Sequence, residues 1–145
     1  MKIKDIARIS GRPVITIAPD ATMRQAVQML VDSKIGALPV VDKNGAVLGI
    51  VSERDLLKSC TLGSGTIDTT KVETIMTKDI VIALVEDDID YISSVMTQHG
   101  IRHMPVMAGP KLANMISMRD IVNAELADLE VKVRFLNAYI SGGMV

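Results

Sequence analysis

The chain has 145 residues and a formal net charge of −1; 48% of its residues are hydrophobic, three are aromatic (two Tyr and one Phe), and its one cysteine is Cys60. A chain of this size can bury a core without disulfides, either as one domain or as two half-size units that share a core. The near-neutral charge and the few aromatic residues exclude nucleic-acid binding. The sequence has no apolar run of about 18 residues, which excludes a membrane span. The single cysteine indicates the reducing cytoplasm.

In chain order, the first half is predicted to form a strand, a helix, a β-hairpin and a second helix. Thr22 precedes apolar residues at helical spacing and has the residue type of an N-cap. Asn44-Gly45 lies between two apolar runs and supplies the positive φ of a hairpin turn. The predicted ranges are 14–17 for the strand, 22–33 for the helix, 38–41 and 47–51 for the hairpin, 52–59 for the second helix, and 62–70 for a Gly-, Ser- and Thr-rich linker.

The second half repeats this order and ends in a longer helix. Strands are predicted near 80–84, 104–107 and 112–117, and a helix at 88–99. The last helix continues past Asp120 to Gly142-Gly143, a length of about 30 Å at 1.5 Å per residue. Its apolar positions follow a 4-3-4-3-4 spacing at Val122, Leu126, Leu129, Val133, Leu136 and Ile140. This stripe needs a partner, either a second copy of the chain or the chain itself folded back.

The two halves are copies of one unit. Ile35, Pro39 and Val40 recur 66 residues later, and Ser52, Arg54 and Asp55 recur 65 residues later as Ser117, Arg119 and Asp120. The fold class is therefore α+β, with two β-α-β-β-α units packed face to face around a pseudo-twofold axis that leaves a cleft. The predicted division is repeat 1 with an N-terminal helix at 1–60, a linker at 61–70, repeat 2 at 71–124 and a helical extension at 125–145.

The repeated Ser-x-Arg-Asp motif stands where a strand turns into a helix. Ser at the N-cap and Asp three residues later form a capping box, and helix initiation alone would explain a single copy. A helix N-terminus with an Arg nearby also suits a phosphate, and the Asp can accept both hydrogen bonds of a ribose diol. Because a cap does not require the Arg that recurs in both copies, the motif favours binding of an adenosine phosphate.

The ordered segments V-I-T-I-A-P-D-A-T, I-G-A-L-P-V-V-D and L-G-I-V-S-E-R-D-L-L resemble the CBS domain, named for cystathionine β-synthase, and the pair resembles a Bateman module over residues 1 to about 124. The resemblance implies a ligand-responsive module that binds AMP, ADP, ATP, S-adenosylmethionine or NAD between the repeats. It assigns the ribose to Asp55 and Asp120, and it assigns ribose or phosphate contacts to Ser52, Ser117, Arg54 and Arg119. It further implies base and phosphate contacts at Thr16, Ala37, Leu38, Arg102, His103 and Met104.

The two copies differ at positions that matter for binding. Copy two has Ile82 in place of Thr16, and it has Asn114, whose side chain is expected to crowd the pocket, in place of Gly49. Its Arg102 and His103 replace Gly36 and Ala37 of copy one, so they can meet a phosphate from across the cleft. We therefore predict that the better site is built on Asp55 and that Asp120 forms the lesser one.

No nucleophile, base and metal-ligand set gathers in one part of the sequence, so we expect neither an enzyme nor a metal or cofactor site. The prediction is a regulatory, homodimeric sensor of an adenosine-containing small molecule that signals to a separate effector protein. The alternative is a dimeric interaction or scaffold protein whose nucleotide cleft is vestigial.

Overall fold

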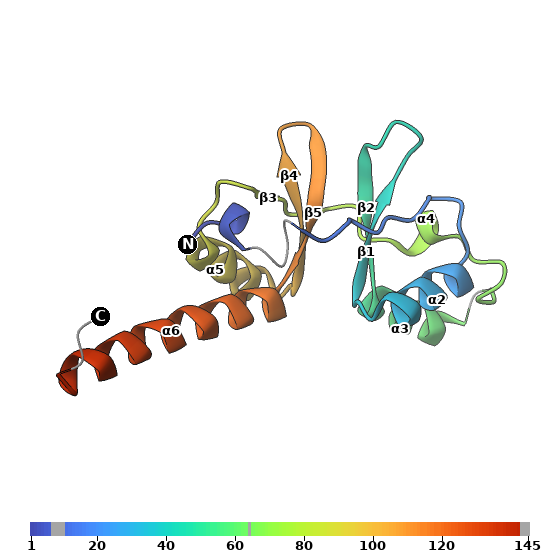
Figure 1. Cartoon of the computed structure of the whole chain (residues 1–145). Helices are drawn as coiled ribbons and strands as arrows, with labels where there is room; N and C mark the ends of the chain where they lie inside the picture. The colour runs from blue at the N-terminus through green and yellow to red at the C-terminus, as the bar shows by residue number, and fades with distance from the viewer. Residues whose placement is uncertain (7–10, 64, 143–145) are drawn as a thin grey trace.

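Two similar halves stand side by side, with their β-hairpins adjacent in the middle and their helices to either side (Figure 1). The computed structural model describes residues 1–6, 11–63 and 65–142. The first half contains α2 (Met23–Ser33), β1 (Ala37–Val41), β2 (Val47–Ser52), α3 (Glu53–Leu62) and α4 (Val72–Ile75). The second contains β3 (Ala83–Leu84), α5 (Ile89–His99), β4 (His103–Ala108), β5 (Lys111–Ser117) and α6 (Met118–Ile140), and the short 3-10 helix η1 (Ile3–Asp5) packs on it. The predicted α+β class with two repeats is confirmed.

Three of the helices begin at reciprocal capping boxes. Thr22 caps α2 as predicted, accepting a hydrogen bond from the Gln25 backbone N–H at 3.3 Å, while the Gln25 side chain accepts one from the Thr22 N–H at 2.8 Å. Ser52 and Ser117 do the same for α3 and α6. Each box satisfies backbone donors that would otherwise lack partners in the first turn of the helix, so the start of the helix is fixed locally.

The first predicted strand of each repeat is shorter than expected. In place of a strand over 14–17, only Ile17 pairs with β1, where its N–H donates to the Pro39 carbonyl at 3.1 Å and its carbonyl accepts from the Val41 N–H at 3.0 Å. In the second half the strand is limited to Ala83–Leu84, which pairs in parallel with β4. Residues 12–15 line the cavity between the halves instead.

Each half has its own apolar core, and the N-terminus belongs to the second. Ile3 is 1% exposed within the second core, with Ile6 beside it. The backbone N–H groups of Ile3 and Lys4 donate to carbonyls of Asp87 and Val85 at 3.0 and 3.1 Å. The division by sequence placed residues 1–60 in repeat 1 with an N-terminal helix, but residues 1–6 form a 3-10 turn in the core of repeat 2. The position of residues 1–6 depends on their contacts with the second half, so it does not follow from the sequence of the segment itself.

Helix α6 extends from the second half as an isolated rod (Figure 1). Asp120 and Ile121 in its first turn are buried, but the apolar stripe beyond them does not fold back on the chain. The six stripe residues are between 44% and 79% exposed: Val122, Leu126, Leu129, Val133, Leu136 and Ile140. Within the described part of the chain, no helix combines the length and apolar character needed to cross a membrane.

Candidate functional site

Two of the cavities formed by the described residues lie between the halves, one at each capping carboxylate. The cavity at Asp120 has a volume of about 1020 Å³, and the cavity at Asp55 has about 230 Å³. Small-molecule pockets usually span about 300–1,000 Å³, so only the first has the size of a ligand site. The two cavities share one wall, made of Gly36, Glu53, Arg102 and His103.

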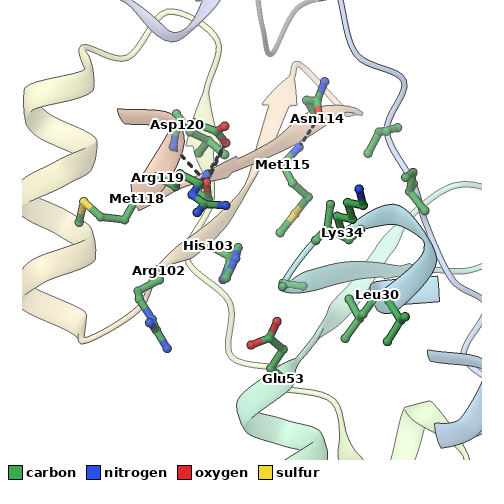
Figure 2. Close-up of a pocket in the computed structure, with 18 of the residues that line it drawn as sticks. Leu30, Lys34, Glu53, Arg102, His103, Asn114, Met115, Met118, Arg119 and Asp120 are labelled. Atoms are coloured by element: carbon green, nitrogen blue, oxygen red, sulfur yellow. Dashed lines mark hydrogen bonds between the residues drawn. The ribbon is translucent and has the colours of Figure 1, made fainter. Parts of the chain in front are cut away.

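Asp120 is 7% exposed at the N-terminus of α6 and faces the larger cavity (Figure 2). Its Oδ2 accepts hydrogen bonds from the Ser117 N–H at 2.8 Å and the Ser117 hydroxyl at 2.9 Å. The guanidinium of Arg12 lies 3.5 Å from the same oxygen and forms an ion pair. Burying a carboxylate is costly without hydrogen-bonded or charged partners, and Ser117 and Arg12 are such partners for Asp120.

Asp55 repeats this arrangement at the N-terminus of α3. Its Oδ2 accepts from the Ser52 N–H at 2.8 Å and from the Ser52 hydroxyl at 3.0 Å. Its other oxygen, Oδ1, accepts from the Thr77 hydroxyl at 2.9 Å. The outward-facing oxygen of Asp55 is therefore engaged by the chain itself, in a cavity too small for a nucleotide.

Asn114 does not crowd the larger cavity as the sequence comparison suggested. Its side chain is 95% buried (5% exposed), its Nδ2 donates to the Arg12 carbonyl at 2.8 Å, and its Oδ1 accepts from the Met115 N–H at 2.8 Å. The side chain is thus turned toward the backbone that forms the cavity wall. The larger cavity lies at Asp120, where the sequence predicted the lesser site, and the smaller one lies at Asp55.

Two arginines, Arg102 just before β4 and Arg119 in α6, face the first half across the larger cavity. Figure 2 shows Arg102, His103 and Arg119 on one side, with Leu30 and Lys34 on the other. Burial, with help from the Arg102 charge, lowers the pKa of His103, while Glu53 and Asp120 oppose this effect. Gly36 makes room for the imidazole, because a Cβ on Gly36 would lie 3.0 Å from the His103 ring. His103 is therefore held neutral at neutral pH beside a wall that carries permanent positive charge.

Nine of the twelve residues assigned from the sequence line a cavity. Those at the larger one are Ala37, Ser117, Arg119 and Asp120; those at the smaller one are Ser52, Arg54 and Asp55; and those at both are Arg102 and His103. Leu38 and Met104 line neither cavity, and their side chains are 0% and 1% exposed within the two cores. Successive residues of a strand point to opposite faces, so Ala37 and His103 face the cleft while the residues after them face the core. Thr16 lines neither cavity.

Residues absent from the sequence assignment also contribute to the cavities. Arg12, Glu53 and Lys34 line the larger one, and Glu53 and Thr77 line the smaller one. Extending the 66-residue offset toward the N-terminus pairs Arg12 with Lys78 and Gly11 with Thr77, so Arg12 and Thr77 lie in equivalent segments of the two repeats. This pairing does not by itself predict that either segment lines a cavity.

Residues 3–61 and 72–127 match the family model described as the CBS domain. The chain is a tandem pair of CBS domains. This CBS pair is 30% identical over 149 aligned positions to a CBS domain-containing protein, CBSX3, mitochondrial, from Arabidopsis thaliana, and the alignment covers 97% of the present chain and 72% of that protein. The resemblance stated from the sequence motifs is thereby confirmed at the level of the family.

Solved structures agree with the fold of this CBS pair. A CBS-domain containing protein from Agrobacterium tumefaciens aligns with a TM-score of 0.80 at 36% identity, covering 86% of this chain and 92% of that one. The CBS domain pair of protein MJ0100, solved in complex with 5′-methylthioadenosine and S-adenosyl-L-methionine, aligns with a TM-score of 0.76 at 25% identity, covering 86% and 98%. The overall fold of the pair thus recurs in solved CBS-domain proteins.

Proposed function

We propose that this CBS pair is a non-catalytic regulatory module that binds an adenosine-containing ligand in the cavity at Asp120. The observation that carries the proposal is a buried carboxylate at a helix N-terminus inside a cavity of about 1020 Å³. The MJ0100 pair, which was solved in complex with 5′-methylthioadenosine and S-adenosyl-L-methionine, supports the ligand class. The physiological ligand is expected among AMP, ADP, ATP, S-adenosylmethionine and NAD.

The chemistry of the wall assigns a role to each part of such a ligand. Asp120 accepts hydrogen bonds from the ribose hydroxyls, because its Oδ2 is fixed by Ser117 and the carboxylate faces the cavity. Arg119, Arg102 and the first turn of α6 supply positive charge and backbone donors for a phosphate. Apolar side chains of Ile15 and Met115 offer surfaces for a flat base.

Arg12 must be displaced or redirected when a ribose reaches Asp120. Its guanidinium now contacts both the Asp120 carboxylate at 3.5 Å and the Met115 carbonyl at 3.2 Å. Because its side chain is 37% exposed, the guanidinium can move into solvent, and the ribose hydroxyls then replace its contact with Asp120. A phosphorylated ligand provides a new partner for the freed guanidinium, so anionic ligands are expected to bind more tightly than adenosine.

The signal is a change in the relative position of the two halves. Residues of both halves line the cavity, so a ligand that fits one relative position better than another shifts the population toward it. The exposed stripe of α6 is suited to pairing with a second copy, and we propose a homodimer whose geometry passes the change to an effector protein.

Thermal denaturation with a ligand panel tests the proposal. At 100 times its dissociation constant, a ligand of the folded state raises the free energy of unfolding by about 2.7 kcal/mol. AMP, ADP, ATP, S-adenosylmethionine and NAD should be compared with GMP as the matched control for the base. A raised melting temperature with one or more adenosine ligands is the expected result. No shift with any of them would overturn the proposal and favour a scaffold whose cleft is vestigial.

A further inference from the structure

The two cavities differ because the chain segment that forms one wall of each is attached to the hairpin in different ways. In the first half, the Ile50 N–H donates to the Thr77 carbonyl at 2.9 Å, and the Thr77 N–H donates to the Ile50 carbonyl at 2.8 Å. This backbone bridge brings the segment at Thr77 directly against β2. Gly49 permits the approach, since a Cβ there would lie 2.6 Å from the Thr77 carbonyl oxygen.

In the second half, side chains take the place of that backbone bridge. Met115 occupies the position of Ile50, 65 residues later, and Asn114 occupies that of Gly49. The Met115 N–H donates to Asn114 Oδ1 at 2.8 Å, and the Met115 carbonyl accepts from the Arg12 guanidinium at 3.2 Å. Asn114 Nδ2 then donates to the Arg12 carbonyl at 2.8 Å. Both backbone groups of Met115 are satisfied, but the segment at Arg12 is held away by the length of a side chain.

The volumes follow this difference in attachment. The cavity beside the direct bridge has about 230 Å³, and the cavity beside the side-chain attachment has about 1020 Å³. The two capping boxes that supply the carboxylates are equivalent, with hydrogen bonds of 2.8 to 3.0 Å in both. The carboxylates therefore do not distinguish the sites, whereas the wall segments do.

We propose that Asn114 and Arg12 form a spacer that determines which of the two cavities accepts a nucleotide. The proposal rests on the proposed function and deepens it: the CBS pair takes one nucleotide per chain, in the cavity at Asp120. Asn114 is a specificity-determining residue that acts by positioning the Arg12 segment. Replacing it with the glycine of the other repeat should let the segment close onto β5.

Amide hydrogen exchange tests the spacer without any ligand. In Asn114→Gly, we expect the Met115 amide to exchange at least tenfold more slowly than in the wild type, because a direct backbone bridge like that of Ile50 replaces its side-chain partner. Asn44→Gly, in an exposed hairpin turn, is the matched control and should leave the exchange of Met115 unchanged. Unchanged or faster exchange of Met115 in Asn114→Gly would overturn the spacer, whether or not a nucleotide binds.

Titration with AMP, followed by native mass spectrometry and calorimetry, tests the consequence for binding. We expect one AMP per wild-type chain, at least tenfold weaker binding to Asn114→Gly, and a second AMP bound by Gly49→Asn, whose side chain forces the Ile50–Thr77 bridge apart. Two equivalent AMP molecules on the wild type, or unchanged affinity in Asn114→Gly, would overturn the inference. If the whole ligand panel fails to bind the wild type while Met115 exchange slows as expected, the spacer stands and the proposed function falls.

Discussion

Replacing each capping aspartate with asparagine separates binding from folding, because the two capping boxes are built alike although the cavities beside them differ in size. Each carboxylate accepts two hydrogen bonds from its N-cap serine, so Asp55→Asn and Asp120→Asn weaken equivalent caps. We expect each to cost about 1 kcal/mol of stability, which corresponds to a melting temperature lower by about 3 °C for a chain of this length. Asp55→Asn is therefore the matched control for the structural effect of Asp120→Asn.

The two variants should differ in AMP binding. Hydrogen bonds to a charged acceptor contribute about 1.5–3 kcal/mol and those to a neutral one about 0.5–1.5 kcal/mol, so two ribose hydroxyls lose about 2–3 kcal/mol in Asp120→Asn. In the Asp120→Asn variant the ligand no longer has to break the ion pair between Arg12 and Asp120 at 3.5 Å. This recovers at most about 1 kcal/mol of binding free energy, because Arg12 is partly exposed. The net loss of about 1–3 kcal/mol corresponds to roughly 5- to 150-fold weaker binding.

Isothermal titration calorimetry with AMP measures this difference directly. Asp55→Asn should keep its dissociation constant within about twofold of the wild type, since Asp55 lines only the smaller cavity. Equal or greater weakening in Asp55→Asn would refute the reasoning from cavity size and restore the ranking suggested by the sequence alone.

Five further outcomes are expected. A phosphate beside neutral His103 should raise its lowered pKa, so calorimetry near pH 6.5 in buffers of different ionisation enthalpy should show proton uptake with AMP but not with adenosine; equal uptake would contradict this. The unfolded chain binds the His103 proton more readily than the folded one, so the free energy of unfolding should fall as pH drops through about 6.5, and less so in His103→Gln. Gly36→Ala places a Cβ 3.0 Å from the His103 ring and should weaken AMP binding severalfold with little change in melting temperature; an unchanged dissociation constant would show that the ring can move freely. Ile3→Ala should lose about 2–5 kcal/mol in urea denaturation, and a loss near zero would mean that the N-terminus is not part of the core. Leu129→Lys should convert a dimer into a monomer by light scattering, and a monomeric wild type would contradict the proposed role of α6.

Local and repeated features of the fold could be predicted from the sequence. The capping boxes at Ser52 and Ser117 depend on residues three apart, so one copy of the motif predicts both the helix start and the carboxylate position. Strict alternation along β1 and β4 would have placed Leu38 and Met104 in the cores. Features that depend on distant segments escaped prediction, as at Arg12, whose partner Asp120 lies 108 positions away.

The unequal cavities show why comparing the repeats position by position gave the opposite ranking. Asn114 is larger than Gly49, so a view of the position alone suggests less space. Its actual effect depends on the backbone segment opposite, which its amide holds at a distance. A larger side chain thus coincides with a larger cavity, and only the tertiary arrangement reveals it.

The path of the N-terminal segment makes the halves mutually dependent. Residues 1–6 contribute to the core of the second repeat, whereas Ile17 pairs with β1 of the first. The N-terminal part of the chain therefore contacts both repeats (Figure 1). During synthesis, residues 1–6 emerge well before residues 83–121, which contain their core partners, so they cannot pack until most of the second repeat has been made. A fragment that begins at residue 71 should consequently be rescued by a peptide carrying residues 1–6, as in classical fragment complementation.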